Sequence, residues 1–245
     1  MDNISKLFYK DYYQGVDFNY VLNGKDPDKK MVKESIGEMN KKIKKSTLVE
    51  MPRLSYVTHP FSAKIAYPGL VTGTGLVHDS KKMEGAFNLG MHFDYTFGMP
   101  VVYGSSVKGV LRRYFKEFYE GKIDKEKLWK DIFSGVASDG TNKSIYNRDI
   151  FFDAVITQAY SDNRGTHLLE DDSITPHAEG PLKNPIPITM LKIASGCEIT
   201  FRFQLHDSVV DGLKFSAEEK LELFEKILKT VGVGAKTNVG YGQLE

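Results

Sequence analysis

The chain has 245 residues, which is long enough to bury a hydrophobic core and allows one large domain or two small ones. Its 33 Lys and Arg residues against 32 Asp and Glu residues leave a formal net charge of +1, which excludes a global charge that binds nucleic acid or membranes indiscriminately, so a site for a polyanion has to be local. The single cysteine, Cys197, excludes an intramolecular disulfide bond and a cysteine-based zinc cluster, and it fits the reducing cytoplasm in which we expect the chain to work.

Residues 1–53 are polar and have a helical pattern, and we expect them to form an N-terminal helical extension. The triplet Asp26-Pro27-Asp28 is a start signal for a helix through KKMVKESIGEMNKKIKKS. Four lysines near its end favour a solvated face over a phosphate site: Lys41, Lys42, Lys44 and Lys45. We find no apolar run long enough to span a bilayer, so no membrane partner is expected.

Residues 54–245 mix strand and helix patterns, and we expect them to form one domain. From Phe61 the alternating segment FSAKIAYPGLVTGTGL predicts a strand that ends in a glycine-containing turn. The extended stretch GMHFDYTFGMPVVYG then precedes SSVKGVLRRYFKEFYEG. This segment predicts a helix that is capped by Ser105 or Ser106 and stopped by Gly121.

The next segments predict strands around a long polar insertion. RDIFFDAVIT indicates a buried strand in which the carboxylate of Asp153 holds a turn through hydrogen bonds. The insertion covers residues 158–187, and loops of this length inside a domain are usually functional or disordered. Two strand patterns on either side of Ser195-Gly196 predict a hairpin.

A helix and a glycine-rich loop end the chain. SAEEKLELFEKILKTVG has Ser216 and Glu219 at capping-box spacing, and its apolar residues form one stripe. The loop GVGAKTNVGYG follows, and residues 241–244 predict a short last strand. The order of elements resembles an elaborated split βαβ arrangement, so we expect an α+β fold with helices on one face of an antiparallel sheet.

The glycine-rich loop, residues 232–242, does not fit the known nucleotide-binding motifs. A P-loop needs a glycine directly before the lysine and a helix that follows, and the spacing of the dinucleotide fingerprint also fails. The glycines nevertheless make backbone N–H groups accessible beside Lys236 and Tyr241, a combination that can hold a phosphate and stack a base. A plain C-terminal turn is the alternative.

The segment GSSVKGVLRR is a second candidate for anion binding. Ser105, Ser106 and Lys108 occupy the first turn of the predicted helix, where unpaired N–H groups carry partial positive charge. Arg112 lies one turn further on the face of Lys108, and Arg113 lies beside it, off that face. An ordinary capped helix with exposed bases explains the segment equally well.

The histidines and acidic residues match no metal or catalytic pattern. THLLEDDSITPH fits a solvated acidic loop better than a metal site, although His177 after Pro176 is placed to reach an RNA base or phosphate. His59, His78 and His92 stand in no triad order, so we interpret them as structural. We therefore expect no catalytic residue, no metal and no cofactor.

Five segments, taken in order, resemble the RAMP superfamily of CRISPR-associated proteins: MPVVYGSSVKGVLRRYF, FFDAVI, SITPH, PIPITMLKIASG and VGVGAKTNVGYG. Within it they are most similar to the sixth subunits of the Cmr effector complexes of type III-B systems. The resemblance implies a modified ferredoxin-like (RRM-like) domain over residues 54–245, with residues 158–187 as a loop or thumb-like hairpin. It also implies a non-catalytic RNA-binding subunit in antiviral defence, whose partners are CRISPR RNA, target RNA and other Cmr subunits.

Carried over by position, the resemblance places the RNA contacts in two groups. They are Gly104, Ser105, Ser106, Lys108 and Arg112 in the first group, and Gly234, Ala235, Lys236, Thr237 and Asn238 in the second. Where the family has IPGSS this chain has VYGSS, so Tyr103 replaces a proline and offers a ring for stacking.

Two alternatives stay open at this point. The first is a metal-independent RAMP endoribonuclease that processes CRISPR RNA with His78, His92 or His177 as general acid or base. The second, a small-molecule nucleotide-binding enzyme, depends on glycine content alone.

Overall fold

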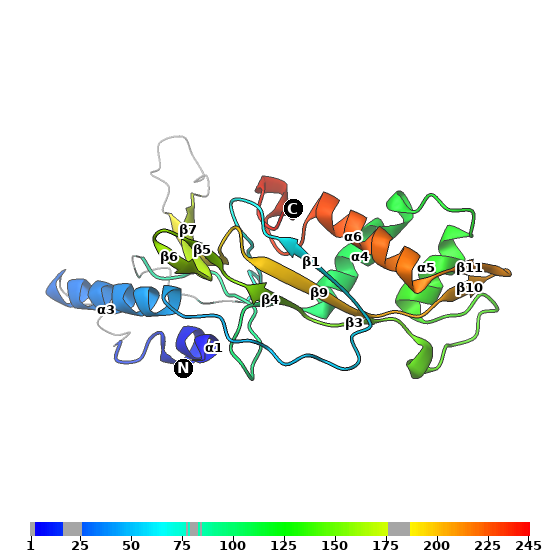
Figure 1. The fold of residues 1–245 in the computed structure, drawn as a ribbon. Coiled ribbons are helices and arrows are strands. Elements are labelled where there is room, and N and C mark those ends of the chain that lie inside the picture. The colour runs from blue at the N-terminus through cyan, green and yellow to red at the C-terminus, as the bar shows by residue number, and fades with distance from the viewer. Residues whose placement is uncertain (1–2, 17–25, 77, 79–82, 84, 176–186) are drawn as a thin grey trace.

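The computed structural model describes residues 3–16, 26–76, 78, 83, 85–175 and 187–245 (Figure 1). This part of the chain contains both helices and strands, with most strands between α5 and α6, and one connected hydrophobic core extends through most of it. Within the described residues, no helix is both long and apolar enough to cross a membrane.

A five-stranded antiparallel sheet forms the centre of the molecule. Its main path runs β1 (His59–Lys64), β9 (Glu198–Gln204), β4 (Ala154–Gln158) and β2 (Val101–Val102), and β3 (Ile150–Phe151) also pairs with β9. All of these pairs are antiparallel. The strand expected from Phe61 is therefore confirmed, whereas the buried strand expected over RDIFFDAVIT is divided into β3 and β4.

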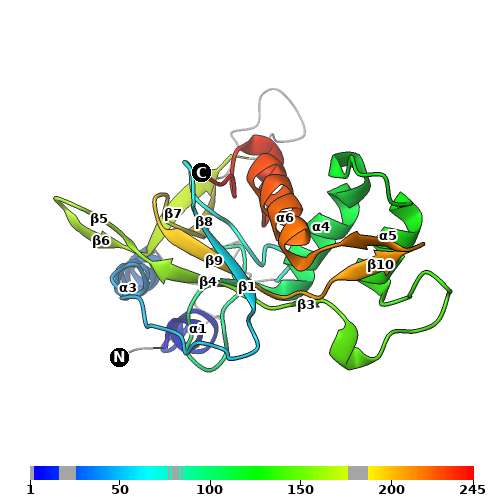
Figure 2. The ribbon, with the colours of Figure 1, turned by 45° about the vertical axis from the view of Figure 1, so that its right-hand side comes forward.

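Alternation along the strands gives the sheet one buried face. Phe61, Phe201 and Phe203 point into the core, while Ser62 and Thr200 lie on the opposite face with their hydroxyl oxygens 2.7 Å apart. Helices α4 (Gly104–Phe118) and α6 (Ala217–Val231) cover the buried face, and α5 (Lys125–Ser134) packs beside α4 (Figure 2). The predicted α+β arrangement, with helices on one face of an antiparallel sheet, is confirmed.

The hairpin predicted around Ser195-Gly196 is wrong. Both strands form, but β8 (Ile188–Ile193) pairs with β7 (Leu169–Ile174) in a separate ribbon, and β9 joins the central sheet. The turn between them makes a corner in which the amide of Gly196 donates to the carbonyl of Ile65 at 2.7 Å.

The insertion predicted over residues 158–187 contains strands in its described part. β5 (Tyr160–Asp162) and β6 (Gly165–His167) form a hairpin that projects from the molecule in Figure 2, and β7 follows. The last strand predicted over residues 241–244 is reduced to one bridge, between Leu244 and Ile65. Sequence reasoning missed α5 and the hairpin of β10 (Ser208–Val210) and β11 (Leu213–Phe215).

The helices expected near the N-terminus are present. α1 (Ile4–Lys6) continues into the helical turn η1 (Leu7–Asp11), and α3 covers Asp26–Lys44. Phe8 and Tyr12 are buried and belong to the same core as the sheet residues. This part of the chain therefore packs directly against the rest of the molecule.

Candidate functional site

Helix α4 begins one residue before the predicted capping serines. Its N-cap is Tyr103, and Ser105 and Ser106 lie inside the first turn. The amide of Gly104 donates to Oδ1 of Asp153 at 2.7 Å, so the carboxylate from the β3–β4 connection satisfies the helix end and complements its dipole. A Cβ on Gly104 would lie 2.1 Å from the carbonyl oxygen of Phe151. Gly104 therefore serves this close contact, and its amide is not available to a phosphate.

The basic residues of α4 lie on two different faces. The ammonium of Lys108 lies 5.5 Å from the ring centroid of Phe151, and the guanidinium carbon of Arg112 lies 4.7 Å from that of Trp129. Burial, and then the neighbouring guanidinium of Arg112, lowers the pKa of Lys108. Arg113 is exposed on the other side of the helix, where it lines a pocket.

The glycines of the glycine-rich loop are required by backbone packing. A Cβ on Gly242 would lie 1.8 Å from the carbonyl oxygen of Val233, and one on Gly234 would lie 2.5 Å from that of Val71. The amide of Ala235 donates to the same carbonyl of Val71 at 2.8 Å. The loop therefore folds back on itself and lies against the chain that follows β1.

Tyr241 does not offer its ring to a base, which corrects the expectation from the sequence. The side chain is buried, and its hydroxyl donates to Oδ2 of Asp172 at 2.9 Å. Burial, together with the neighbouring carboxylate, raises the pKa of Tyr241 to about 12. Tyr241 therefore anchors the loop to β7.

The outer part of the loop stays accessible. Lys236 has a positive φ of 61° and precedes the turn η3 (Thr237–Val239), and among the described residues it makes no hydrogen bond or ion pair through its side chain. Asn238 is exposed. These residues form a polar rim with one free cation beside Ala235, which lines the pocket.

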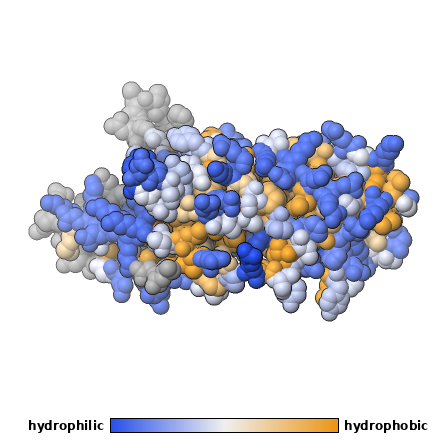
Figure 3. All heavy atoms as spheres, in the orientation of Figure 1, coloured by the Kyte–Doolittle hydropathy of each residue, from blue (hydrophilic) through white to orange (hydrophobic). Residues whose placement is uncertain are grey.

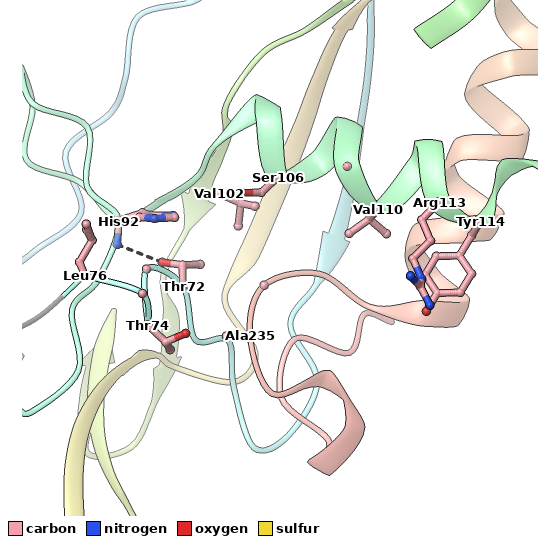
Figure 4. Close-up of a pocket in the computed structure, with 14 residues that line it drawn as sticks. Thr72, Thr74, Leu76, His92, Val102, Ser106, Val110, Arg113, Tyr114 and Ala235 are labelled. Atoms are coloured by element: carbon pink, nitrogen blue, oxygen red, sulfur yellow. Dashed lines mark hydrogen bonds between the residues drawn. The ribbon is translucent and has the colours of Figure 1, made fainter. Parts of the chain in front are cut away.

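The pocket brings together three segments that are far apart in the sequence (Figure 4). It has a volume of about 580 Å³, within the range of ligand sites. One wall is the turn at residues 72–76, the second is α4 with Ser106, Gly109, Val110, Arg113 and Tyr114, and the third is the glycine-rich loop with Gly234 and Ala235. His92 and Val102, from the chain before α4, complete the lining. Sequence reasoning identified the glycines at 73 and 75 as a turn but had no signal that it faces α4.

His92 occupies one end of the pocket. Its ring stacks on Tyr103 with centroids 4.1 Å apart, and its backbone amide donates to Oγ1 of Thr72 at 3.2 Å (Figure 4). Burial lowers the pKa of His92, which keeps the ring neutral at physiological pH. Of the histidines considered for catalysis, His92 is the one that the structure places in the pocket.

His78 has a structural role, as predicted. It is buried and stacks on Phe8, and its two ring nitrogens lie 2.6 and 2.8 Å from the carbonyl oxygens of Phe8 and Phe87. His177 lies outside the described residues, so its predicted RNA contact has no structural counterpart here.

The acidic segment predicted as a solvated loop is instead strand β7, in which acids pair with lysines. Nζ of Lys44 lies 2.8 Å from Asp171, and Nζ of Lys192 lies 3.0 Å from Asp172. Within the part of the chain that the structure describes, no three His, Cys, Asp or Glu residues are grouped as metal ligands.

The structure thus defines an α+β protein with an open pocket between helix α4 and the C-terminal glycine-rich loop. Residues 63–245 match the RAMP superfamily, and the chain belongs to that superfamily. Among curated protein sequences, none matches the chain.

Solved structures extend the comparison. A chain in the cryo-EM structure of the Type III-B Cmr-beta bound to cognate target RNA is 20% identical, with a TM-score of 0.58 over 98% of this chain and 84% of that chain. Cmr6 from Pyrococcus furiosus is 19% identical over 76% of this chain and 97% of that one (TM-score 0.35), and a chain of a Type IV-B CRISPR complex is 18% identical over 76% and 88% (TM-score 0.41). The first match shows a shared fold.

Proposed function

We propose that the chain is a non-catalytic RNA-binding subunit of a type III-B CRISPR (Cmr) effector complex, which contacts CRISPR RNA and the guide–target duplex in cytoplasmic antiviral defence. Membership of the RAMP superfamily supports the assignment to CRISPR systems. The fold shared with a chain of the Cmr-beta complex bound to target RNA supports the choice of complex.

The observation that carries the proposal is the meeting of two motifs at one open pocket. Helix α4 contributes Ser106 and Arg113, and the glycine-rich loop contributes Gly234 and Ala235 from more than a hundred residues later. Lys236 lies next to Ala235, so the pocket and its rim carry positive charge in a chain that is nearly neutral. A local basic site beside accessible backbone and hydroxyl groups is typical of contacts with a sugar–phosphate chain.

Exposed apolar side chains support the presence of partner subunits. Val209 and Leu213 at the β10–β11 hairpin are 58% and 50% exposed. Figure 3 shows apolar residues at the end of the molecule where these strands lie, between hydrophilic regions. Two exposed apolar side chains on one hairpin suit a surface that packs against another protein.

The test uses the assembled complex and the salt dependence of its RNA binding. Arg113→Gln and Lys236→Gln each remove a cation of the pocket or its rim, and each lost phosphate contact lowers the slope of log K against log salt by about one. Arg53→Gln is the matched control, because Arg53 is also an exposed arginine but neither lines the pocket nor belongs to the predicted RNA contacts. Equal slopes for wild type, Arg113→Gln and Lys236→Gln would falsify the assignment.

One observation favours the alternative function, a metal-independent endoribonuclease. His92 lies in the same pocket as Ser106 and Arg113. The purified chain is incubated with CRISPR precursor RNA in EDTA. We expect no cleavage. Cleavage that His92→Ala abolishes would make the chain an enzyme and refute the non-catalytic role.

A further inference from the structure

Two glycines of the pocket are not required by the fold. A Cβ built on Gly75 or Gly109 would meet no atom within 4 Å, and neither residue has a positive φ. Gly73 and Gly234 line the same pocket but have φ angles of +69° and +91°, and a Cβ on them would lie 2.6 and 2.5 Å from backbone atoms. The two pairs of glycines therefore have different reasons to lack a side chain.

Gly109 is the more informative of the unexplained pair. It lies in the interior of α4, where glycine is the poorest helix former after proline. No packing neighbour compensates for this loss of helix propensity. What the missing side chain does provide is room, because the backbone of α4 itself becomes the wall of the pocket at this point. Glycine at such a place allows another backbone or a ligand to approach closely.

The two ends of the pocket have different chemistry. In the described part of the chain, Arg113 is the only charged side chain among the lining residues, and it forms no ion pair. Ser106 and Arg113 are seven residues apart on α4, so the pocket follows the helix for about 10 Å. Figure 4 shows Arg113 at one end and the ring of His92 at the other. A cation at one end of the pocket matches the phosphate of a nucleotide, and a ring at the other end matches its base. The exposed backbone between them leaves room for the ribose.

We infer that the pocket holds one unpaired ribonucleotide of a bound RNA strand, with its phosphate at Arg113, its ribose against Gly109 and its base against His92. This inference rests on the proposed RNA-binding function and specifies the chemical unit that is bound. A paired base is stacked inside a helix, so only an unpaired nucleotide can enter. The lowered pKa of His92 supports a neutral ring that stacks on a base.

The test fills the pocket without disturbing the fold. Gly109→Leu places a side chain in the pocket, and Gly109→Ala places only a methyl group. The matched control is Gly37→Leu, because Gly37 is also a glycine inside a helix, α3, with no atom within 4 Å of a built Cβ, and it does not line the pocket. Leucine is a better helix former than glycine, so both leucine variants should keep or raise the unfolding temperature.

Binding is measured by the fluorescence anisotropy of a labelled single-stranded RNA titrated with the full-length chain. We expect Gly109→Leu to weaken binding by about tenfold or more, which corresponds to the loss of one stacked base, with a smaller effect for Gly109→Ala and none for Gly37→Leu. Binding of a duplex of the same sequence should not change. An equal loss for the duplex would overturn the unpaired state of the nucleotide.

The other outcomes separate this inference from the proposed function. If Gly109→Leu binds single strands like wild type while Arg113→Gln binds more weakly, RNA binding stands and the pocket is not its nucleotide site. If free AMP binds wild type but not Gly109→Leu, and RNA affinity is the same in both, the occupant is a free nucleotide and the inference is wrong. If wild type binds RNA neither alone nor in the assembled complex, the proposed function itself fails.

Discussion

A buried ion pair ties helix α6 to the central sheet. Nζ of Lys220 lies 2.6 Å from Oδ2 of Asp149 and 2.6 Å from the carbonyl oxygen of His206, and the side chains of Lys220 and Asp149 are both 0% exposed. The second oxygen of Asp149 accepts the amide of His206 at 2.8 Å. Every polar atom of this pair thus depends on a protein partner, so removal of one partner has a large effect.

Asp149→Asn keeps the shape of the side chain but leaves the ammonium of Lys220 buried without a counter-charge. Removing one member of a buried ion pair costs about 3–5 kcal/mol of unfolding free energy, whereas replacing both members by neutral residues of similar volume is often close to neutral. We therefore expect the double variant Asp149→Asn/Lys220→Met to regain most of the stability that Asp149→Asn loses.

The same variant should show a distinct pH dependence. Burial lowers the pKa of Lys220, and the carboxylate of Asp149 opposes this shift. Without the carboxylate the pKa falls further. A lysine pKa lowered in the folded state means that the unfolded state binds more protons, so stability rises with pH until the unfolded lysine titrates near pH 10.5. The deficit of Asp149→Asn should therefore be smaller at pH 9 than at pH 7.

Urea unfolding followed by the fluorescence of Trp129, the single tryptophan, measures these free energies. A wild-type-like midpoint for Asp149→Asn would refute the reasoning. So would a double variant as unstable as the single one, because the loss would then come from the altered shape or hydrogen bonding and not from an unpaired buried charge.

Three further outcomes follow from the same structure. Gly242→Ala forces a Cβ to 1.8 Å from the carbonyl of Val233 at a φ of +70°, so it should cost more than about 2 kcal/mol in urea unfolding. Tyr241→Phe removes the hydrogen bond to Asp172 and should cost about 1.5–3 kcal/mol at neutral pH. Because the pKa of Tyr241 is raised to about 12 from 10, this stabilisation should be lost as the pH rises from about 10 towards 12, and a constant difference between Tyr241→Phe and wild type would contradict it. Burial raises the pKa of the Cys197 thiol to about 11, so a thiol reagent at pH 8 should react only in denaturant, and fast labelling of the native chain would contradict this burial.

Signals that depend on residues close in sequence predicted part of the fold correctly. The capping box at the start of α6 is present with both of its hydrogen bonds, because Ser216 and Glu219 need only each other's backbone. The same local logic failed at α4. There Asp153, forty-nine residues away, bonds the first amide and displaces the serines from the capping role.

Local sequence patterns do not predict which strands pair with each other. β8 and β9 are consecutive and joined by a tight turn, which is the signature of a hairpin, yet they enter different sheets. The competing partners are distant: β7 supplies a complete six-pair register to β8, and β1 does the same for β9. Pairing with a distant strand outweighs the local turn, and no pattern within residues 188–204 reports it.

The candidate site, like the fold, was predicted only in the part that depends on residues close in sequence. Helical periodicity separated Arg113 from the face of Lys108 and Arg112, but only the packing of α4 on the sheet shows that the pocket lies on the side of Arg113. The pairing of His92 with Tyr103 depends on a loop whose path the sequence does not encode in any local pattern.

The glycines show why composition alone misplaces the site. The dense glycines at the end of the chain suggested a ligand cradle, but Gly234 and Gly242 are fixed by carbonyl oxygens that a Cβ would strike, so the fold accounts for them. The isolated Gly109 lies in a strong helical pattern that gave no sign of a ligand, and, like Gly75, it is a pocket glycine that the fold does not explain. A glycine on the wall of an open pocket that the fold does not explain is stronger evidence for a ligand than a cluster of glycines that the fold does explain.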